Sequence, residues 1–79
     1  MNLYLCSQNS NDDYDTYDSF IGAFDNEEEA RNQHPDDNTE WGSGYSTWCS
    51  SPDDVVVVFI GEADASLFKG IVLTSFNAG

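Results

Sequence analysis

Acidic side chains are concentrated in one stretch of this chain, residues 9–40, and they restrict which residues can form a core. The stretch carries eleven of the fifteen acidic residues but only one of the two basic residues, Arg31. The eleven are Asp12, Asp13, Asp15, Asp18, Asp25, Glu27, Glu28, Glu29, Asp36, Asp37 and Glu40. An apolar segment, residues 20–24, lies in their middle. We therefore expect the apolar residues to build a small scaffold and the carboxylates to form its working surface.

The composition predicts a folded domain in spite of the charge. Seventy-nine residues make a single domain, residues 1–79, near the lower size limit for a self-sufficient core. Apolar and aromatic fractions of 39% and 14% are too high for a disordered acidic tail. The net charge of −13 exceeds the magnitude of about 2–8 that keeps a small domain soluble. Such a charge disfavours binding to DNA or to an anionic membrane and favours a cationic partner surface.

Sequence features of export and of membrane insertion are missing, so we expect a cytoplasmic protein. The first eight residues lack the basic region and the long apolar core of a signal peptide. The longest apolar run, Val55 to Ile60, is far shorter than the roughly 20 residues of a membrane span. Cys6 and Cys49 do not make the disulfide framework of a secreted miniprotein, and we interpret them as reduced thiols, with a bridge between them as the alternative.

Apolar patterning predicts the order strand, strand, helix, strand, strand. The helix is expected over residues 26–34, with Asp25 as its N-cap, Glu28 at the capping-box spacing and Pro35 ending it. Residues 9–18 and 36–52 are expected to be loops. The four strands are expected at residues 2–8, 19–24, 55–60 and 70–76.

These elements predict an α+β fold, a small and mainly antiparallel sheet of three to four strands with one short helix packed on one face. The run from Val55 to Ile60 is interpreted as a central strand, because all its residues are β-branched or aromatic. Trp41, Tyr45 and Trp48 are expected to pack over one end of the core. The other face of the sheet is expected to be partly open, with tyrosine and threonine exposed.

Residues with metal-binding or nucleophilic chemistry do not form a recognisable motif. Asn11, Asp13 and Asp15 match the first positions of an EF-hand loop, but the glycine at its sixth position and the glutamate at its twelfth are missing. One histidine, His34, and two distant cysteines give no zinc-ligand spacing. His34 instead suits the C-terminus of the predicted helix. We therefore expect no catalytic residue, no metal and no cofactor, and we do not expect an enzyme.

The acidic array is the strongest candidate for a binding site. A compact chain of this length spans roughly 30 Å, and B-DNA of that length carries about 18 phosphates. Fifteen carboxylates approach that charge. Tyrosines alternate with aspartates in residues 12–18, and rings and carboxylates together suit Arg and Lys. The alternative is a well-solvated surface, with one tyrosine covering the core edge. The candidate contact residues are Asp12, Asp13, Tyr14, Asp15, Tyr17, Asp18, Glu27, Glu28, Glu29, Asp36 and Asp37.

Several segments resemble a group of small phage and prophage proteins, and the similarity keeps its order along most of the chain, leaving out mainly the loop at 36–50. They are LYLCSQ at 3–8, YDTYDS at 14–19, EEEARNQHP at 27–35, IGEAD at 60–64 and SFNAG at 75–79. Through that group the chain resembles the anti-CRISPR proteins, phage products that disable a bacterial CRISPR–Cas effector. Several of those are acidic and look like DNA mimics. The resemblance implies a type I effector, with type I-C among the candidates, in an infected bacterium. It implies no site residues, so the contact residues depend on charge alone.

Charge and resemblance together predict a monomeric inhibitor that acts by binding. It would occupy the basic DNA-binding surface of a CRISPR–Cas effector subunit and block target DNA, without touching nucleic acid or membrane itself. One alternative is an acidic structural or regulatory phage protein that contacts its partner through Trp41, Tyr45 or Trp48. Another alternative is a cation-binding module.

Overall fold

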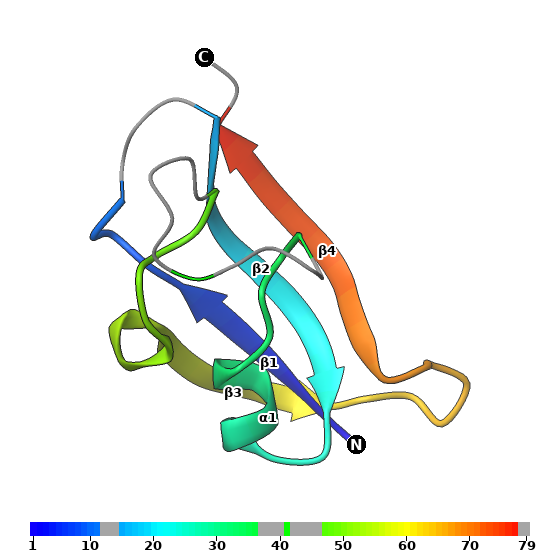
Figure 1. Cartoon of the computed structure of the whole chain (residues 1–79). Coiled ribbons are helices and arrows are strands. Elements are labelled where there is room, and N and C mark those ends of the chain that lie inside the picture. The colour runs from blue at the N-terminus through cyan, green and yellow to red at the C-terminus, as the bar shows by residue number, and fades with distance from the viewer. Residues whose placement is uncertain (12–14, 37–40, 42–46, 78–79) are drawn as a thin grey trace.

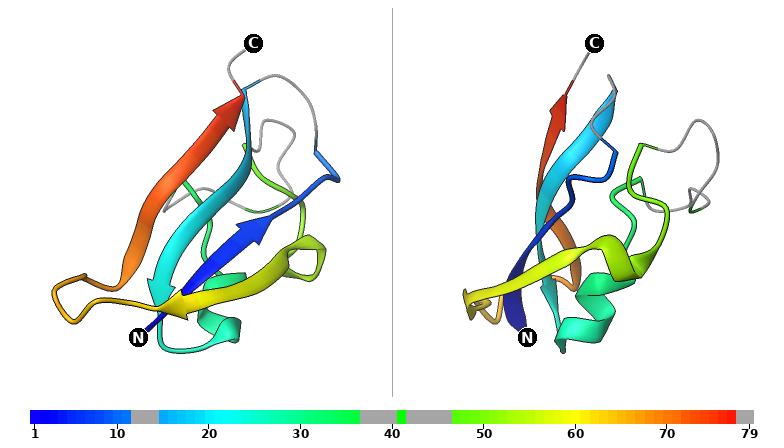
Figure 2. Two further views of the ribbon diagram at one scale, coloured as in Figure 1. Left: turned by 180° about the vertical axis from the view of Figure 1, so that it is seen from behind. Right: turned by 90° about the vertical axis from the view of Figure 1, so that its left-hand side faces the viewer.

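The structure is a computed structural model that describes residues 1–11, 15–36, 41 and 47–77. Its four described strands form one antiparallel sheet in the order β3-β1-β2-β4 (Figure 1). A short helix and a 3-10 turn lie on one side of this sheet (Figure 2). This arrangement confirms the predicted α+β class. The elements are β1 Asn2–Ser7, β2 Thr16–Phe24, α1 Glu27–Arg31, η1 Pro52–Asp54, β3 Val56–Glu62 and β4 Gly70–Asn77.

Strand β2 begins at Thr16, three residues earlier than predicted. Thr16 pairs with Asn77 and Tyr17 pairs with Phe76, and the register shifts before Ser19. The sequence did not indicate this part of the strand, because its residues are polar and do not alternate with apolar ones. Backbone pairing with β4 defines it instead.

Strand β3 is an edge strand, so the prediction of a central strand was wrong. Its only described neighbour is β1, against which Val57 pairs with Cys6. Val57 is half-buried, whereas Val56, Val58 and Phe59 are exposed. β-branched and aromatic residues indicate a strand, but they do not indicate its place in the sheet.

Helix α1 is shorter than predicted, and it has a different cap. Asn26 is the N-cap, and its side-chain oxygen accepts a hydrogen bond from the backbone N–H of Glu29 at 2.9 Å. The helix ends at Arg31, well before Pro35. A helix of five residues cannot depend on intrinsic propensity alone. Its Ala30 is fully buried under the sheet, so packing holds the helix in place.

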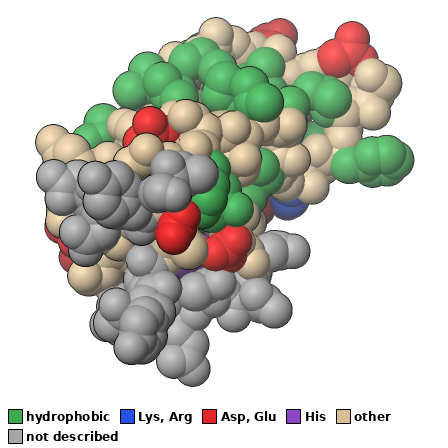
Figure 3. Space-filling view, turned by 90° about the horizontal axis from the view of Figure 1, so that it is seen from above, with side chains coloured by type: hydrophobic (Ala, Val, Ile, Leu, Met, Phe, Trp, Pro, Cys, Tyr) green, Lys and Arg blue, Asp and Glu red, His purple; other side chains and the backbone are tan. Residues whose placement is uncertain are grey.

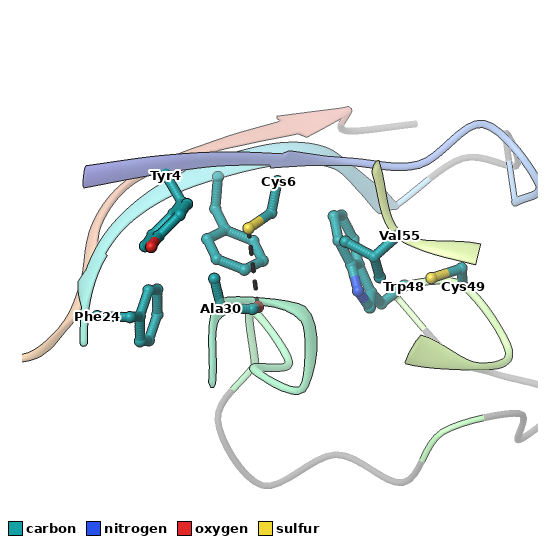
Figure 4. Packing of buried hydrophobic residues seen from close by; sticks show 8 residues of the cluster. Tyr4, Cys6, Phe24, Ala30, Trp48, Cys49 and Val55 are labelled. Atoms are coloured by element: carbon teal, nitrogen blue, oxygen red, sulfur yellow. Dashed lines mark hydrogen bonds between the residues drawn. The ribbon is translucent and has the colours of Figure 1, made fainter. Parts of the chain in front are cut away.

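The core lies between the sheet and the segments on its covered side (Figure 4). Phe20 and Trp48 are its largest fully buried side chains, with ring centroids 5.5 Å apart. Trp41 packs against the same cluster, which confirms the prediction for two of the three aromatic residues; Tyr45 lies outside the described residues. Burial raises the pKa of the Cys6 thiol to about 12, and Cys6 and Cys49 are both free, which suits core thiols.

The opposite face of the sheet is open and apolar. Leu5 on β1 and Ile21 on β2 pair across it, and both are partly accessible. Hydrophobic side chains lie side by side over the upper part of the space-filling view (Figure 3). The face is partly open as expected, but the tyrosines expected there are not on it, because Tyr4 is buried and Tyr17 packs against the core. Thr16 is buried as well, and the exposed Thr74 pairs with the core residue Phe20, so it belongs to the covered face. No helix in the described part of the chain is long and apolar enough to cross a membrane.

Candidate acidic interaction surface

Arg31 connects helix α1 to turn η1, and each of these elements carries two exposed carboxylates. Its Nη2 donates to Glu27 Oε1 at 3.1 Å, an ion pair one helical turn apart. Its Nη1 donates to the backbone oxygens of Pro52, at 3.4 Å, and of Val55. These bonds connect turn η1 to α1. We call these four residues the helix-side cluster: Glu27, Glu28, Asp53 and Asp54.

Turn η1 owes its form to local capping. The Ser51 side-chain oxygen accepts a hydrogen bond from the N–H of Asp53 at 3.2 Å, and Pro52 occupies the first turn, where its missing N–H costs nothing. This places Asp53 and Asp54 in the first turn. Sequence reasoning missed both residues, although a serine followed by proline and two acids is a recognisable signal for such a turn.

Lys69, the only other Lys or Arg of the chain, is also paired with carboxylates. Its Nζ lies 2.7 Å from Asp25 Oδ2 and 2.9 Å from Glu29 Oε1. The hydrogen bond from Lys69 lowers the pKa of Asp25, and the bonds to Asp25 and Glu29 raise the pKa of Lys69. Both long basic side chains are therefore paired with carboxylates of the chain itself.

Asp15 and Asp18 are exposed at the opposite end of β2. Asp15 adopts a left-handed φ of 62°, which aspartate tolerates better than most residues, and its N–H donates to the Asn77 oxygen at 2.7 Å. A strand rises about 3.3 Å per residue, so Asp18 and Asp25 stand about 23 Å apart. The structure therefore does not bring Asp15 and Asp18 together with the glutamates of α1, and it displays acidic groups at both ends of β2.

Tyr17 and Asp36, two of the predicted contact residues, are bonded to each other inside the fold. The Tyr17 hydroxyl donates to Asp36 Oδ1 at 3.1 Å, and the Thr47 hydroxyl donates to the other oxygen of the same carboxylate. The Tyr17 ring packs against Phe76, with centroids 4.8 Å apart. Burial, followed by the hydrogen bond and charge of Asp36, raises the pKa of Tyr17. These contacts fasten the segment around Asp36 to β2.

Asp36→Ala is therefore expected to lower the free energy of unfolding by about 2 kcal/mol, because hydrogen bonds to a charged group contribute about 1.5–3 kcal/mol. Urea unfolding followed by tryptophan fluorescence measures this loss. Asp18→Ala is the control, because Asp18 is exposed and its side chain accepts a hydrogen bond only from its neighbour Ser19 within the described part of the chain. An equal and small loss in both variants would show that the Asp36 hydrogen bonds do not stabilise the fold.

His34 is buried, at 4% exposure, rather than placed at the end of a helix. Its Nδ1 accepts a hydrogen bond from the N–H of Asp36 at 3.0 Å, and its ring meets Trp41 edge-on with centroids 5.5 Å apart. Burial lowers the pKa of His34, and the charge of Asp36 opposes this effect only in part. The imidazole is thus held neutral in the core.

Stability is expected to decrease as the pH falls below about 6.5, the ordinary pKa of histidine. Folded His34 resists protonation, so the unfolded chain binds more protons in the window between the lowered folded pKa and the unfolded pKa. The stability contribution is complete above the unfolded pKa and is lost as the pH falls toward the folded one. Urea unfolding across this window should show a slope that His34→Gln reduces; equal slopes in both proteins would contradict the prediction.

The remaining predicted contact residues, Asp12, Asp13, Tyr14 and Asp37, lie outside the described residues. Asp13 also belongs to the EF-hand-like spacing, of which the structure therefore describes only Asn11 and Asp15. Within the described ranges, no group of three or more His, Cys, Asp or Glu side chains is placed to hold a metal ion.

Comparison with known proteins gives no relative. No family model matches the chain, and neither a curated protein nor a solved structure matches it.

Proposed function

We propose that this chain is a non-enzymatic binding protein that docks its acidic surface on the basic, nucleic-acid-binding surface of another protein. One observation carries the proposal: Arg31 and Lys69 are both bonded to carboxylates of the chain itself, while the carboxylates of the helix-side cluster, including the Glu27 that pairs with Arg31, stay exposed. The net charge of −13 thus reaches the solvent without a basic patch to offset it. A basic groove that normally holds phosphates is the complementary partner surface.

Size and charge support mimicry of a short duplex. The molecule measures 37 × 23 × 20 Å, and B-DNA as long as its greatest extent carries about 22 phosphates. The sequence has fifteen acidic residues, and those that the structure describes include acidic groups at both ends of β2, on α1 and on η1. Such a surface would steer the chain toward a basic groove and displace the anions bound there.

The resemblance to anti-CRISPR proteins narrows the proposed partner to a type I CRISPR–Cas effector in the cytoplasm of an infected bacterium. Docking on the subunit that holds target DNA would block DNA binding directly. The alternative contact through Trp48 is not supported, because its side chain is only 1% exposed.

A competition assay tests this proposal. A type I effector is incubated with labelled target DNA and increasing amounts of the chain, and bound DNA is measured. The expected result is complete displacement of the DNA, with excess DNA displacing the chain in the reverse titration. An effector that binds the chain and the DNA together, or that ignores the chain at saturating concentration, would overturn the proposal.

A further inference from the structure

An apolar row crosses the open face of the sheet from edge to edge. Leu5 of β1 pairs with Val58 of β3 and with Ile21 of β2, and Ile21 pairs with Leu73 of β4. Adjacent residues of a strand point to opposite faces, and Cys6, next to Leu5, is buried in the core. The row therefore faces away from α1. At its two ends Val58 and Leu73 are 45% and 63% exposed.

Small or apolar residues flank the row on both sides. On one side Ser7 pairs with Ser19, and Ser19 pairs with Ser75. On the other side Leu3 pairs with Ala23. None of these side chains is charged, although the whole chain carries a net charge of −13. Monomeric proteins rarely expose a contiguous apolar patch larger than a few hundred Å² without a function for it.

We propose that this face packs against the same face of a second copy, in a symmetric dimer of two stacked sheets. A basic partner would bind the acidic surfaces instead, because the apolar row and the residues that flank it carry no carboxylate. The face is complementary to another uncharged, apolar sheet face, and a second copy supplies one. A two-fold axis that passes through the row containing Leu5 and Ile21 would pack this row against the same row of the second copy, as in face-to-face sheet packing. The dimer does not depend on the proposed function, and it departs from the monomer expected from the sequence.

The size of the face sets the expected strength of the dimer. Four strands about 4.8 Å apart and six residues rising about 3.3 Å each give a footprint of about 400 Å². The relief of the side chains increases the accessible area above this projection. Even so, the face is smaller than the roughly 800 Å² per partner of a typical stable interface. The dimer is therefore weak and concentration-dependent.

Salt affects this dimer in the opposite direction from binding to a basic partner. Each copy carries a net charge of −13, so the two copies repel each other and salt screens the repulsion. Salt therefore favours the dimer, whereas it weakens an acidic surface bound to a basic groove. The two proposals are separable in one salt series.

Sedimentation equilibrium of the full chain, over about two decades of concentration at low and high salt, tests the dimer. The mass should rise from one chain to two, and high salt should lower the midpoint concentration. Leu73→Glu should raise that midpoint at least about a hundredfold, because the dimer would bury two unpaired carboxylates. Thr74→Glu is the matched control, since it adds the same charge one residue along β4 on the opposite face. It should dimerise like the unmodified chain.

Two results would overturn the dimer: a single-chain mass under every condition, or equal effects of Leu73→Glu and Thr74→Glu. Growth beyond two chains would also overturn it, because the exposed edges of β3 and β4 would then be the contact. Circular dichroism and urea unfolding establish that both variants are folded before the masses are compared.

Discussion

Replacing the four carboxylates of the helix-side cluster by amides is expected to weaken binding to the effector about thirty- to a hundredfold. An exposed ion pair contributes about 0.2–1 kcal/mol, so the loss of four such contacts costs about 2–3 kcal/mol of binding free energy. Each 1.4 kcal/mol changes the dissociation constant about tenfold. Most of the loss should appear in the association rate, because charges at the rim of an interface steer the encounter. Surface plasmon resonance measures both rates. The variant combines Glu27→Gln, Glu28→Gln, Asp53→Asn and Asp54→Asn.

A pair of double variants separates the cluster from the total charge. Asp53→Asn with Asp54→Asn removes two carboxylates from the cluster, and Glu62→Gln with Asp64→Asn removes two from the end of β3 and the segment that follows it. Asn keeps an oxygen that can accept the bond from the Ser66 N–H, at 2.8 Å from Asp64 Oδ1. The first double variant should weaken binding more than the second. Equal losses would mean that net charge rather than this cluster governs binding.

Gly22→Ala is expected to lower the free energy of unfolding by about 3 kcal/mol. A Cβ at position 22 would lie 2.3 Å from a ring carbon of Phe24 and 3.0 Å from the Gly70 oxygen. Phe24 is only 3% exposed, so its ring cannot turn aside without leaving the core. Overpacking costs about 1–3 kcal/mol, and displacing a core phenylalanine costs about as much again. The loss is large against the total of about 5–10 kcal/mol for a small domain.

Urea unfolding in a Phe24→Leu background provides the control. Leucine lacks the ring atoms that meet the new Cβ, so the same alanine should cost less than about 1 kcal/mol there. A similar cost in both backgrounds would show that Gly22 does not serve to make room for Phe24. A glycine in a strand interior ordinarily weakens the strand, and the structure shows that here the Phe24 ring occupies the space that a side chain would need.

The order of the elements could be predicted from the sequence because local patterns carry it. Alternation in residues 2–7 and the β-branched run from Val55 to Ile60 indicate strands, and the acidic residues after Asn26 indicate a helix start. The position of β3 at the edge, and the first residues of β2, could not be predicted, because pairing between distant segments decides both. The α1 N-cap was misplaced by one residue, since Asp25 and Asn26 are both good caps.

The candidate site was only partly predictable for the same reason. Charge pointed to Glu27 and Glu28, but nothing local indicates that the turn carrying Asp53 and Asp54 is connected to the same helix. That connection depends on Arg31, whose guanidinium donates to carbonyls 21 and 24 residues away. Charge alone also overstated the role of Asp36, which the structure bonds to Tyr17 and Thr47.

Equilibrium binding of the unmodified chain to a type I effector, measured across a salt series, tests docking through the carboxylates most directly. If carboxylates occupy phosphate sites, the association constant should fall steeply as salt rises, because screening weakens each pair and anions compete for the groove. A constant that stays level, or that increases with salt, would contradict electrostatic docking.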